Sequence, residues 1–190
     1  MREILSMIIV LSAICSISGF SLAYLKETTA PLIEVQVLEN VQGPAIAQVY
    51  PAADNQPVEE RKSFEIDGRK IMIFPYKQAG KLEGVALEGK GGGFGGNIGV
   101  MVGFNVNNDT LLGIGVTEMK ETPGLGTKVA EPKFANQFKG IDLNVDVKAK
   151  GGTIDAISGS TVSSLGTVGA VQAAAKDYQA LKNKILETWK

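Results

Sequence analysis

The stretch KLEGVALEGKGGGFGGNIGVMVGFNVNNDTLLGIGVTEMKE, residues 81–121, decides the fold of this chain. Apolar residues alternate with polar residues or glycine in three runs, a pattern that is typical of β-strands. A glycine loop separates the first two runs, and a turn at residues 107–110 separates the second run from the third. Consecutive strands that are joined by short loops pair antiparallel. The stretch therefore predicts three strands of an antiparallel sheet.

The residues before this stretch extend the predicted sheet. KSFEIDGRKIMIFPYK, residues 62–77, contains two alternating runs around Asp67-Gly68. Asp-Gly between two such runs is a strong hairpin signal, because these residues tolerate the positive φ of a tight hairpin turn. Residues 62–77 therefore predict a β-hairpin that precedes the three strands.

The residues after the predicted strands are mixed in type. PKFANQFKGID, residues 132–142, predicts one short helix, and IDLNVDVK, residues 141–148, predicts a strand. Residues 161–189 predict a long helix, because their apolar side chains recur at helical spacing. These side chains are Val171, Ala174, Tyr178, Leu181 and Ile185. Together the elements predict one α+β domain, an antiparallel sheet with flanking helices.

The amino-terminal stretch ILSMIIVLSAICSISGFSLAYL, residues 4–25, contains no charged side chain. As a helix it would span roughly 33 Å, about the thickness of the hydrocarbon core of a membrane. A cleaved signal peptide is the alternative, since Ser21-Leu22-Ala23 has the form of a cleavage site. The apolar run is long for a signal peptide and favours a single retained transmembrane helix. Arg2 before the run favours an orientation with the amino terminus inside, so that the rest of the chain is expected on the extracytoplasmic (periplasmic) side of an inner or cytoplasmic membrane.

The segment between this anchor and the sheet predicts a connection. Its apolar residues follow helical steps up to a break near Gly43-Pro44, and YPAADNQP, residues 50–57, is rich in turn residues. We therefore divide the chain into an anchor (1–25), a connecting helical and loop segment (26–58) and a domain (59–190).

Composition excludes several classes of function. The chain has 19 basic and 20 acidic residues and a sequence pI near 5.6, which argues against nucleic acid as a partner. It has no histidine, so a Ser-His-Asp or Cys-His nucleophile cannot form within it. Its single cysteine, Cys15, excludes an internal disulfide and a cysteine metal cluster. Redox chemistry would therefore require a bound organic cofactor.

Two loops are candidates for binding such a cofactor. KGGGFGGNIG, residues 90–99, offers glycines for a close backbone approach and Phe94 as a ring contact, or it is only a flexible hairpin connection. KETPGLGTK, residues 120–128, offers the Thr122 hydroxyl and unobstructed glycine amides that suit a flat ring with carbonyl edges. A plain Pro-Gly turn is the alternative for this second loop.

The third candidate, TIDAISGSTVSS, residues 153–164, runs from a predicted strand through Gly159 into the final helix. The exposed amides and the dipole at a helix start favour a bound phosphate. A routine helix cap by Ser160 or Thr161 is the alternative. Residue types by themselves leave both interpretations open.

The three stretches together, behind one apolar helix, resemble the FMN-binding domain family, and most closely the G subunits of Rnf ion-translocating electron-transport complexes. The related C subunits of the sodium-translocating NADH:quinone reductase are also similar. ETPGLG is close to a family signature, and DAISGSTVSS is similar to the flavinylation motif Asp-x-x-Ser/Thr-Gly-Ala-Thr. Two positions depart from the family pattern, because Ser160 stands where alanine is common and Met119 where histidine is frequent.

The resemblance implies covalent FMN, joined by a phosphoester to Thr161 by a separate flavin transferase that uses FAD and Mg²⁺. It implies that Asp155 belongs to the sequence recognised by that transferase, and that Glu121 orients its loop or faces solvent rather than acting as a base. The cofactor-binding residues that follow from this resemblance are Thr161, Ser158, Gly159, Ser160, Ser163, Asp155, Thr122, Pro123, Gly124, Leu125, Gly126, Phe94 and Gly95. Neither a catalytic residue nor a metal ligand is expected.

The implied function is electron relay by a membrane-anchored subunit of an ion-translocating oxidoreductase that is not catalytic alone. Its expected partners are the other subunits of the complex, the flavin transferase during maturation, and membrane lipid. Two alternatives remain: a stand-alone FMN-domain electron carrier that serves another extracytoplasmic reductase, and a non-redox exported binding module.

Overall fold

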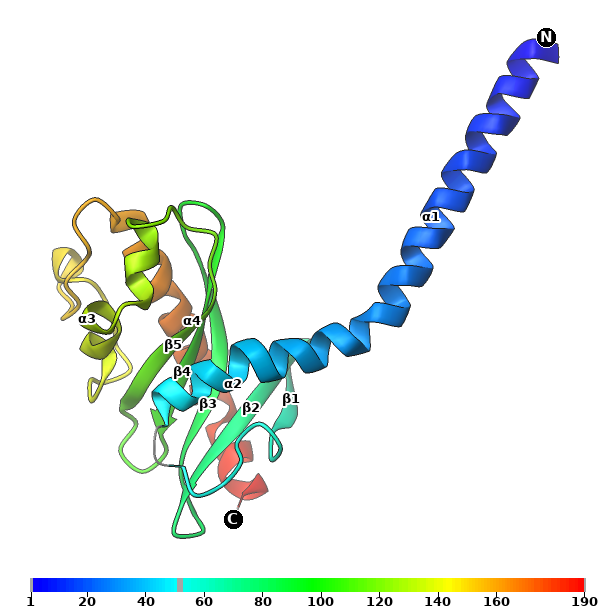
Figure 1. Cartoon of the computed structure of the whole chain (residues 1–190). Coiled ribbons are helices and arrows are strands. Elements are labelled where there is room, and N and C mark those ends of the chain that lie inside the picture. The colour runs from blue at the N-terminus through cyan, green and yellow to red at the C-terminus, as the bar shows by residue number, and fades with distance from the viewer. Residues whose placement is uncertain (1, 51–52, 190) are drawn as a thin grey trace. The chain divides into compact units, whose positions relative to one another are not determined.

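The computed structural model describes residues 2–50 and 53–189, so part of the predicted loop at 50–57 lies outside the described residues. The chain divides into two compact units, one that ends at Glu39 and one that begins at Asn40. Figure 1 shows the elements of both units along the chain.

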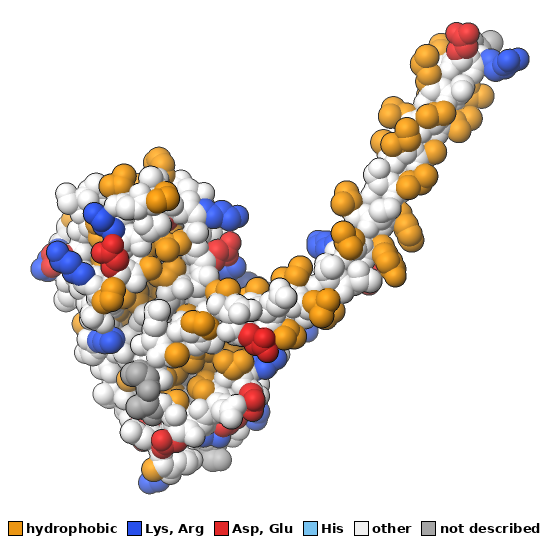
Figure 2. Space-filling view, in the orientation of Figure 1, with side chains coloured by type: hydrophobic (Ala, Val, Ile, Leu, Met, Phe, Trp, Pro, Cys, Tyr) orange, Lys and Arg blue, Asp and Glu red, His pale blue; other side chains and the backbone are white. Residues whose placement is uncertain are grey.

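The first unit is dominated by helix α1 (Arg2–Val37), which has no buried residue. Among the described residues, one helical segment, Arg2–Val49, is long and apolar enough to cross a membrane, with a mean hydropathy of 2.2 in its most apolar window. Figure 2 shows apolar side chains along the visible face of α1. An exposed helix of this composition fits a bilayer better than water.

The expected helix break near Gly43-Pro44 is wrong. A π-helical turn, η1 (Leu38–Gln42), precedes helix α2 (Gly43–Val49), and Pro44 lies in the first turn of α2. The π-helical turn runs directly into α2, and such a local irregularity accommodates the ring and the missing N–H of a proline inside a helix. The chain therefore remains helical through this dipeptide.

The second unit contains a five-stranded antiparallel sheet in the order β1-β2-β3-β4-β5. The strands are β1 (Lys62–Ile66), β2 (Arg69–Gln78), β3 (Lys81–Gly92), β4 (Asn97–Asn105) and β5 (Leu111–Glu118). The predicted hairpin and the three predicted strands are confirmed. Asp67 and Gly68 both have positive φ, 48° and 73°, as a type I′ hairpin turn requires.

Helices cover the two faces of this sheet. Helix α4 (Thr161–Thr188) packs on β3 and β4, and helix α2 packs on β4 and β5. The α4 helix lies close to the backbone of β3, because a side chain at Gly89 or Gly91 would overlap carbonyl groups of α4. A side chain at Gly103 or Gly115 would instead collide with α2. Because Gly89 and Gly103 belong to opposite faces of the paired strands, the sheet lies between the two helices.

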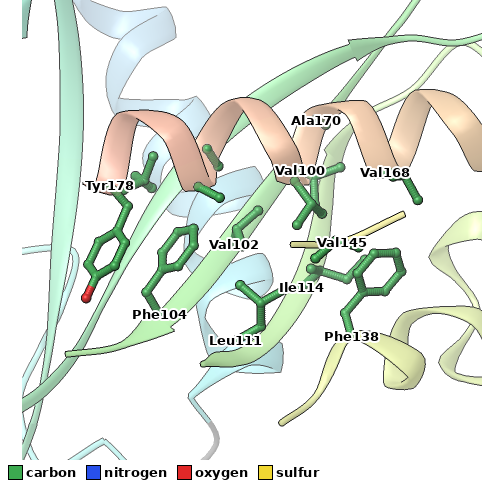
Figure 3. Close-up of a cluster of buried hydrophobic side chains, with 14 of the residues drawn as sticks. Val100, Val102, Phe104, Leu111, Ile114, Phe138, Val145, Val168, Ala170 and Tyr178 are labelled. Atoms are coloured by element: carbon green, nitrogen blue, oxygen red, sulfur yellow. The ribbon is translucent and has the colours of Figure 1, made fainter. Parts of the chain in front are cut away.

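The core fills the space between the sheet and α4. The five apolar positions predicted for the final helix are all buried. Figure 3 shows Tyr178 of α4 beside Phe104 of β4, with Val100, Val102 and Ile114 farther along the same layer. The helix and its apolar face are therefore as predicted, and the fold class, an α+β antiparallel sheet with flanking helices, is confirmed.

Short helical turns connect β5 to α4. They are η2 (Gly126–Ala130), α3 (Pro132–Ala135), η3 (Asn136–Phe138) and η4 (Lys148–Lys150). The predicted helix at residues 132–142 exists but ends at Phe138.

The strand predicted at residues 141–148 is wrong, and so is the strand predicted before Gly159. These segments form only isolated bridges, Thr110 with Asp142 and Val147 with Ile154. The alternation of the first segment instead reflects the burial of Val145 and Val147 in the core. The chain turns back at once, with the Gly152 N–H bonded to the Val147 carbonyl, so no neighbouring strand continues the ladder.

Candidate functional site

Three segments that are distant in the sequence surround one open cavity of about 400 Å³. They are the loop between β3 and β4, the loop after β5, and the first turn of α4. The lining residues are Phe94, Glu121, Thr122, Leu125, Gly126, Gly159, Ser160, Thr161, Val162 and Ser163. The three candidate stretches of the sequence therefore meet in a single site.

Glu121 joins the three segments. Its side chain is buried, its Oε1 atom accepts a hydrogen bond from the Gly95 N–H at 3.1 Å, and its Oε2 atom accepts one from the Ser163 hydroxyl at 2.6 Å. The carboxylate needs room, because a side chain at Gly93 or Gly126 would overlap it. The sequence left two expectations for Glu121, that it orients its loop or that it faces solvent, and the buried, hydrogen-bonded carboxylate agrees with the first and not with the second.

The hydrogen bonds also determine the charge of Glu121. Burial favours the neutral acid and raises the pKa, but the bonds from Ser163, Gly95 and Phe94 outweigh burial, so the pKa of Glu121 is lowered. The carboxylate is therefore ionised at neutral pH. Among the described residues that line the cavity, Glu121 is the one that carries a charge.

The start of α4 lacks the side-chain cap that the sequence suggested as an alternative. Ser160 is the N-cap residue, but its side chain makes no capping hydrogen bond. Its hydroxyl is buried and has no partner among the described residues. The first N–H groups of a helix have no intrahelical acceptor, so this end of α4 offers free donors beside the cavity.

The neighbouring hydroxyl groups have different surroundings. Thr161 is exposed and lines the cavity. The Ser164 hydroxyl accepts from the Ile157 N–H at 3.0 Å and donates to the Ser160 carbonyl at 2.9 Å, which holds the preceding turn. Gly159 completes the turn at a φ of +79°, a conformation that favours glycine.

Apolar side chains surround the mouth of the cavity. Outside α1, the exposed large apolar side chains of the described residues are Phe94, Leu125 and Val162, with exposed fractions of 76%, 48% and 49%. All three line the cavity, although they come from three different segments. Exposed apolar side chains that converge in this way are typical of a site for a ligand or partner with an apolar face.

Some predicted site residues lie elsewhere. Asp155 and Ser158 line a neighbouring cavity of about 680 Å³. Asp155 accepts a hydrogen bond from Lys148 at 2.7 Å, and the Gln137 side chain holds its backbone through two hydrogen bonds.

The loop after β5 uses one of the amides that the sequence suggested as free. The Gly124 N–H donates to the Thr127 hydroxyl at 2.9 Å. Gly124, Pro123 and Gly95 are absent from the cavity lining, although the Gly95 amide contributes through Glu121. Met119 packs against the core.

Two lining residues, Glu121 and Val162, are absent from the predicted cofactor-binding set. Sequence reasoning assigned Glu121 only to the orientation of its loop or to solvent, and it missed Val162 altogether. The signal for Val162 is weak, because a single valine in a helix is more often a core residue. The hydrogen bond from Ser163 to Glu121 also gave no signal, because the two residues are 42 positions apart.

Comparisons with known proteins agree with this geometry. The FMN-binding domain family model matches residues 93–176, which include all three segments of the site. The G subunit of an ion-translocating oxidoreductase complex from Methanosarcina acetivorans is 32% identical over 184 residues, covering 93% of this chain and 95% of that protein. The G subunit of the Na⁺-translocating ferredoxin:NAD⁺ oxidoreductase complex from Acetobacterium woodii is 26% identical over 192 residues, with 91% and 90% coverage.

A solved structure also resembles the fold. The crystal structure of Shewanella oneidensis NqrC matches with a TM-score of 0.53 and 25% identity, covering 72% of this chain and 73% of that one. The cavity, the family match and the near full-length relative converge on one assignment. The chain belongs to the FMN-binding domain family and, within it, to the family of G subunits of ion-translocating oxidoreductase complexes.

Proposed function

We propose that this chain is a membrane-anchored flavoprotein subunit that carries FMN on Thr161 and relays electrons within an Rnf-type ion-translocating oxidoreductase complex. Its FMN-binding domain and its G-subunit relatives support an electron-transfer flavoprotein of such a complex. The covalent link, the anchor and the side of the membrane are the finer parts of the proposal.

The observation that carries the proposal is the position of Thr161. Its exposed side chain lines the cavity at the first residue of a helix of 28 residues. The free amides and the dipole at this helix start favour a phosphate beside the Thr161 hydroxyl. The buried, unpartnered hydroxyl of Ser160 offers a further donor. The residues present therefore fit the phosphate end of FMN.

The charges of the site explain why a covalent link would be useful. The described residues that line the cavity include no lysine or arginine, and they include the ionised Glu121. A phosphate held only by hydrogen bonds beside a carboxylate would bind weakly, because like charges repel. A phosphoester to Thr161 removes the need for a cation in the site.

The apolar side chains fit the other end of the cofactor. Phe94, Leu125 and Val162 offer apolar contacts for a flat ring, and the hydroxyl of Thr122 lies in the same cavity. When bound, FMN supplies one- and two-electron redox chemistry that the side chains of this chain lack. The protein's contribution is to hold the ring and to set its exposure to water and charge.

Helix α1 supports the proposed anchor. We propose that residues 1–25 span the inner or cytoplasmic membrane, that 26–58 connect the span to the domain at 59–190, and that this domain is periplasmic. The length and hydropathy of α1 support the span, and Arg2 before the apolar run supports the orientation. Part of the connection, α2, packs on the sheet.

Mass measurement tests the covalent link. The full-length protein is co-expressed with a flavin transferase, and its intact mass and peptides are analysed. We expect the mass of one FMN residue on the peptide with Thr161, and no gain in Thr161→Ala. The matched control is Thr153→Ala, which removes an exposed hydroxyl that lies outside the motif and outside the cavity lining and should keep the flavin.

Two outcomes would contradict the proposal. A modification on Ser160 would correct the attachment residue but keep the flavoprotein. A folded wild-type protein with no added mass would reject covalent flavin.

Two further experiments test the other parts of the proposal. Co-purification with integral membrane subunits tests the assignment to a complex. Protease cleavage of residues 59–190 only from the cytoplasmic side would reject the orientation.

A further inference from the structure

Glu121 is unusual among the carboxylates of this domain. It is 8% exposed, and no lysine or arginine of the described residues forms a salt bridge with it. An ionised carboxylate that is buried without a cation is costly for stability. Its position in the wall of the cavity suggests a function in the site rather than in folding.

We propose that Glu121 is the positioning residue of the flavin site, where its carboxylate ties the β3–β4 loop to the first turn of α4 and its unneutralised charge lowers the reduction potential of the bound flavin. The inference rests on the proposed function and adds to it, because it assigns one residue to the geometry and the redox potential of the site.

The geometry supports the positioning part. Each oxygen of Glu121 accepts from a different segment, Oε1 from the Gly95 N–H and Oε2 from the Ser163 hydroxyl. Ser163 lies two residues after Thr161 in the same turn of α4. The two hydrogen bonds of Glu121 therefore hold Thr161, the proposed attachment residue, in a fixed position relative to the loop that carries Phe94.

Coulomb's law supports the redox part. A negative charge that is partly shielded from water opposes the addition of electron density to a neighbouring group. Glu121 lines the same cavity as Thr161, and its hydrogen bonds keep it ionised. Removing the charge should therefore make the flavin easier to reduce.

The experiment compares three variants of the full-length flavinylated protein in detergent. Glu121→Gln removes the charge but keeps the size and a hydrogen-bond acceptor, and Glu121→Ala removes both the charge and the tie. The matched control is Glu118→Gln, since Glu118 is exposed, pairs with Lys90 at 3.6 Å and does not line the cavity. The measurements are the flavin midpoint potential and the hydrogen exchange of the Gly95 and Ser164 amides.

We expect both Glu121 variants to shift the midpoint potential upward, and the control to keep the wild-type value. Only Glu121→Ala should speed amide exchange at Gly95, roughly tenfold or more, because it leaves this N–H without any side-chain acceptor, whereas the Gln variant keeps an acceptor oxygen. If Glu121 only held the two segments together, Glu121→Ala would speed amide exchange but Glu121→Gln would keep the wild-type midpoint potential.

Equal potentials in Glu121→Gln and Glu118→Gln would overturn the electrostatic part. Unchanged exchange in Glu121→Ala would overturn the tie. If the wild-type protein carried no flavin, the proposed function and the electrostatic part would both fail. The exchange experiment on the flavin-free protein would still decide whether Glu121 holds the two segments together.

Discussion

Each end of helix α4 donates hydrogen bonds to a carboxylate in a loop of the sheet, but only one of these two carboxylates is paired with a cation. Near the start of the helix, Ser163 donates to Glu121, whereas near its end Tyr178 and Lys182 both donate to Asp109 in the β4–β5 turn. Asp109 is paired with a cation and is partly exposed. Glu121 is buried without a cation.

The packing of the two ends also differs. The first half of α4 contacts β3 through backbone, because Gly91 faces Gly166 and Gly89 faces Ala170 with no intervening side chain. The second half contacts the sheet through rings: Phe104 and Tyr178 stack with centroids 4.5 Å apart (Figure 3).

The start of α4 therefore belongs to the cavity, whereas the end of α4 contributes to the stability of the fold. At the end of α4, the stacked rings of Phe104 and Tyr178 bury apolar surface, and Lys182 neutralises the charge of Asp109. These contacts stabilise the fold. The end with glycines leaves space beside the helix start for a ligand, together with one unneutralised carboxylate. Stabilising contacts should therefore concentrate at one end of α4 and cofactor contacts at the other.

The same substitution at the two ends should give the largest contrast. Phe104→Ala removes a fully buried ring and should cost about 3–5 kcal/mol of unfolding free energy. Phe94→Ala removes a ring that is 76% exposed, and should change stability by less than about 0.5 kcal/mol but weaken cofactor contacts. Urea titration followed by the fluorescence of Trp189, the single tryptophan, measures both. Similar losses in the two variants would contradict the separation.

Adjacent glycines provide a second test, at the cofactor end. Gly91→Ala should cost about 1–3 kcal/mol, because the new methyl group would overlap the Gly166 carbonyl of α4. Gly92→Ala is the matched control, since a methyl group there meets nothing within 4 Å. The same urea titration compares them. Equal stabilities would mean that α4 can move away from β3 without cost.

A hydroxyl deletion sharpens the description of the supporting end. Tyr178→Phe keeps the stack on Phe104 but removes the 2.9 Å hydrogen bond to Asp109. We expect a loss of about 1 kcal/mol of unfolding free energy, the usual net contribution of one hydrogen bond. Flavin content should stay at the wild-type level, because the bond is far along α4 from Thr161. A loss of flavin with no loss of stability would reverse the assignment of the two ends.

The smallest effect is expected from pH. The Lys182 ammonium beside Asp109 lowers the pKa of that carboxyl, against the opposing effect of burial. Since the folded pKa lies below the unfolded one, this contribution is present above the ordinary carboxyl pKa and is lost as the pH falls through the lowered value. The effect should be small because the Asp109 side chain is 44% exposed.

The measurement is the melting temperature as a function of pH for the wild type and Asp109→Asn. Other carboxylates, including Glu121, shift the wild-type curve in the same direction. The difference in melting temperature between the wild type and Asp109→Asn therefore isolates the contribution of Asp109. This difference should become smaller as the pH falls. A difference that stays constant with pH would show that the ion pair contributes nothing.

The amino-acid sequence by itself determined the elements whose signals are local. The turn at Asp67-Gly68 requires positive φ at both residues, and alternation along residues 81–121 places apolar side chains on the faces of the strands. Helical spacing selected the buried face of α4. The motif around Thr161 was also local, because it is a turn and the start of a helix.

Tertiary structure alone decided which candidate residues share the cavity. The partners of Glu121 lie 26 and 42 residues away from it, so no pattern along the chain reveals that one carboxylate joins them. The strand predicted at residues 141–148 failed for the same physical reason. Alternation marks which side chains are buried, but a strand also needs a neighbouring backbone to pair with, and only the folded chain supplies one.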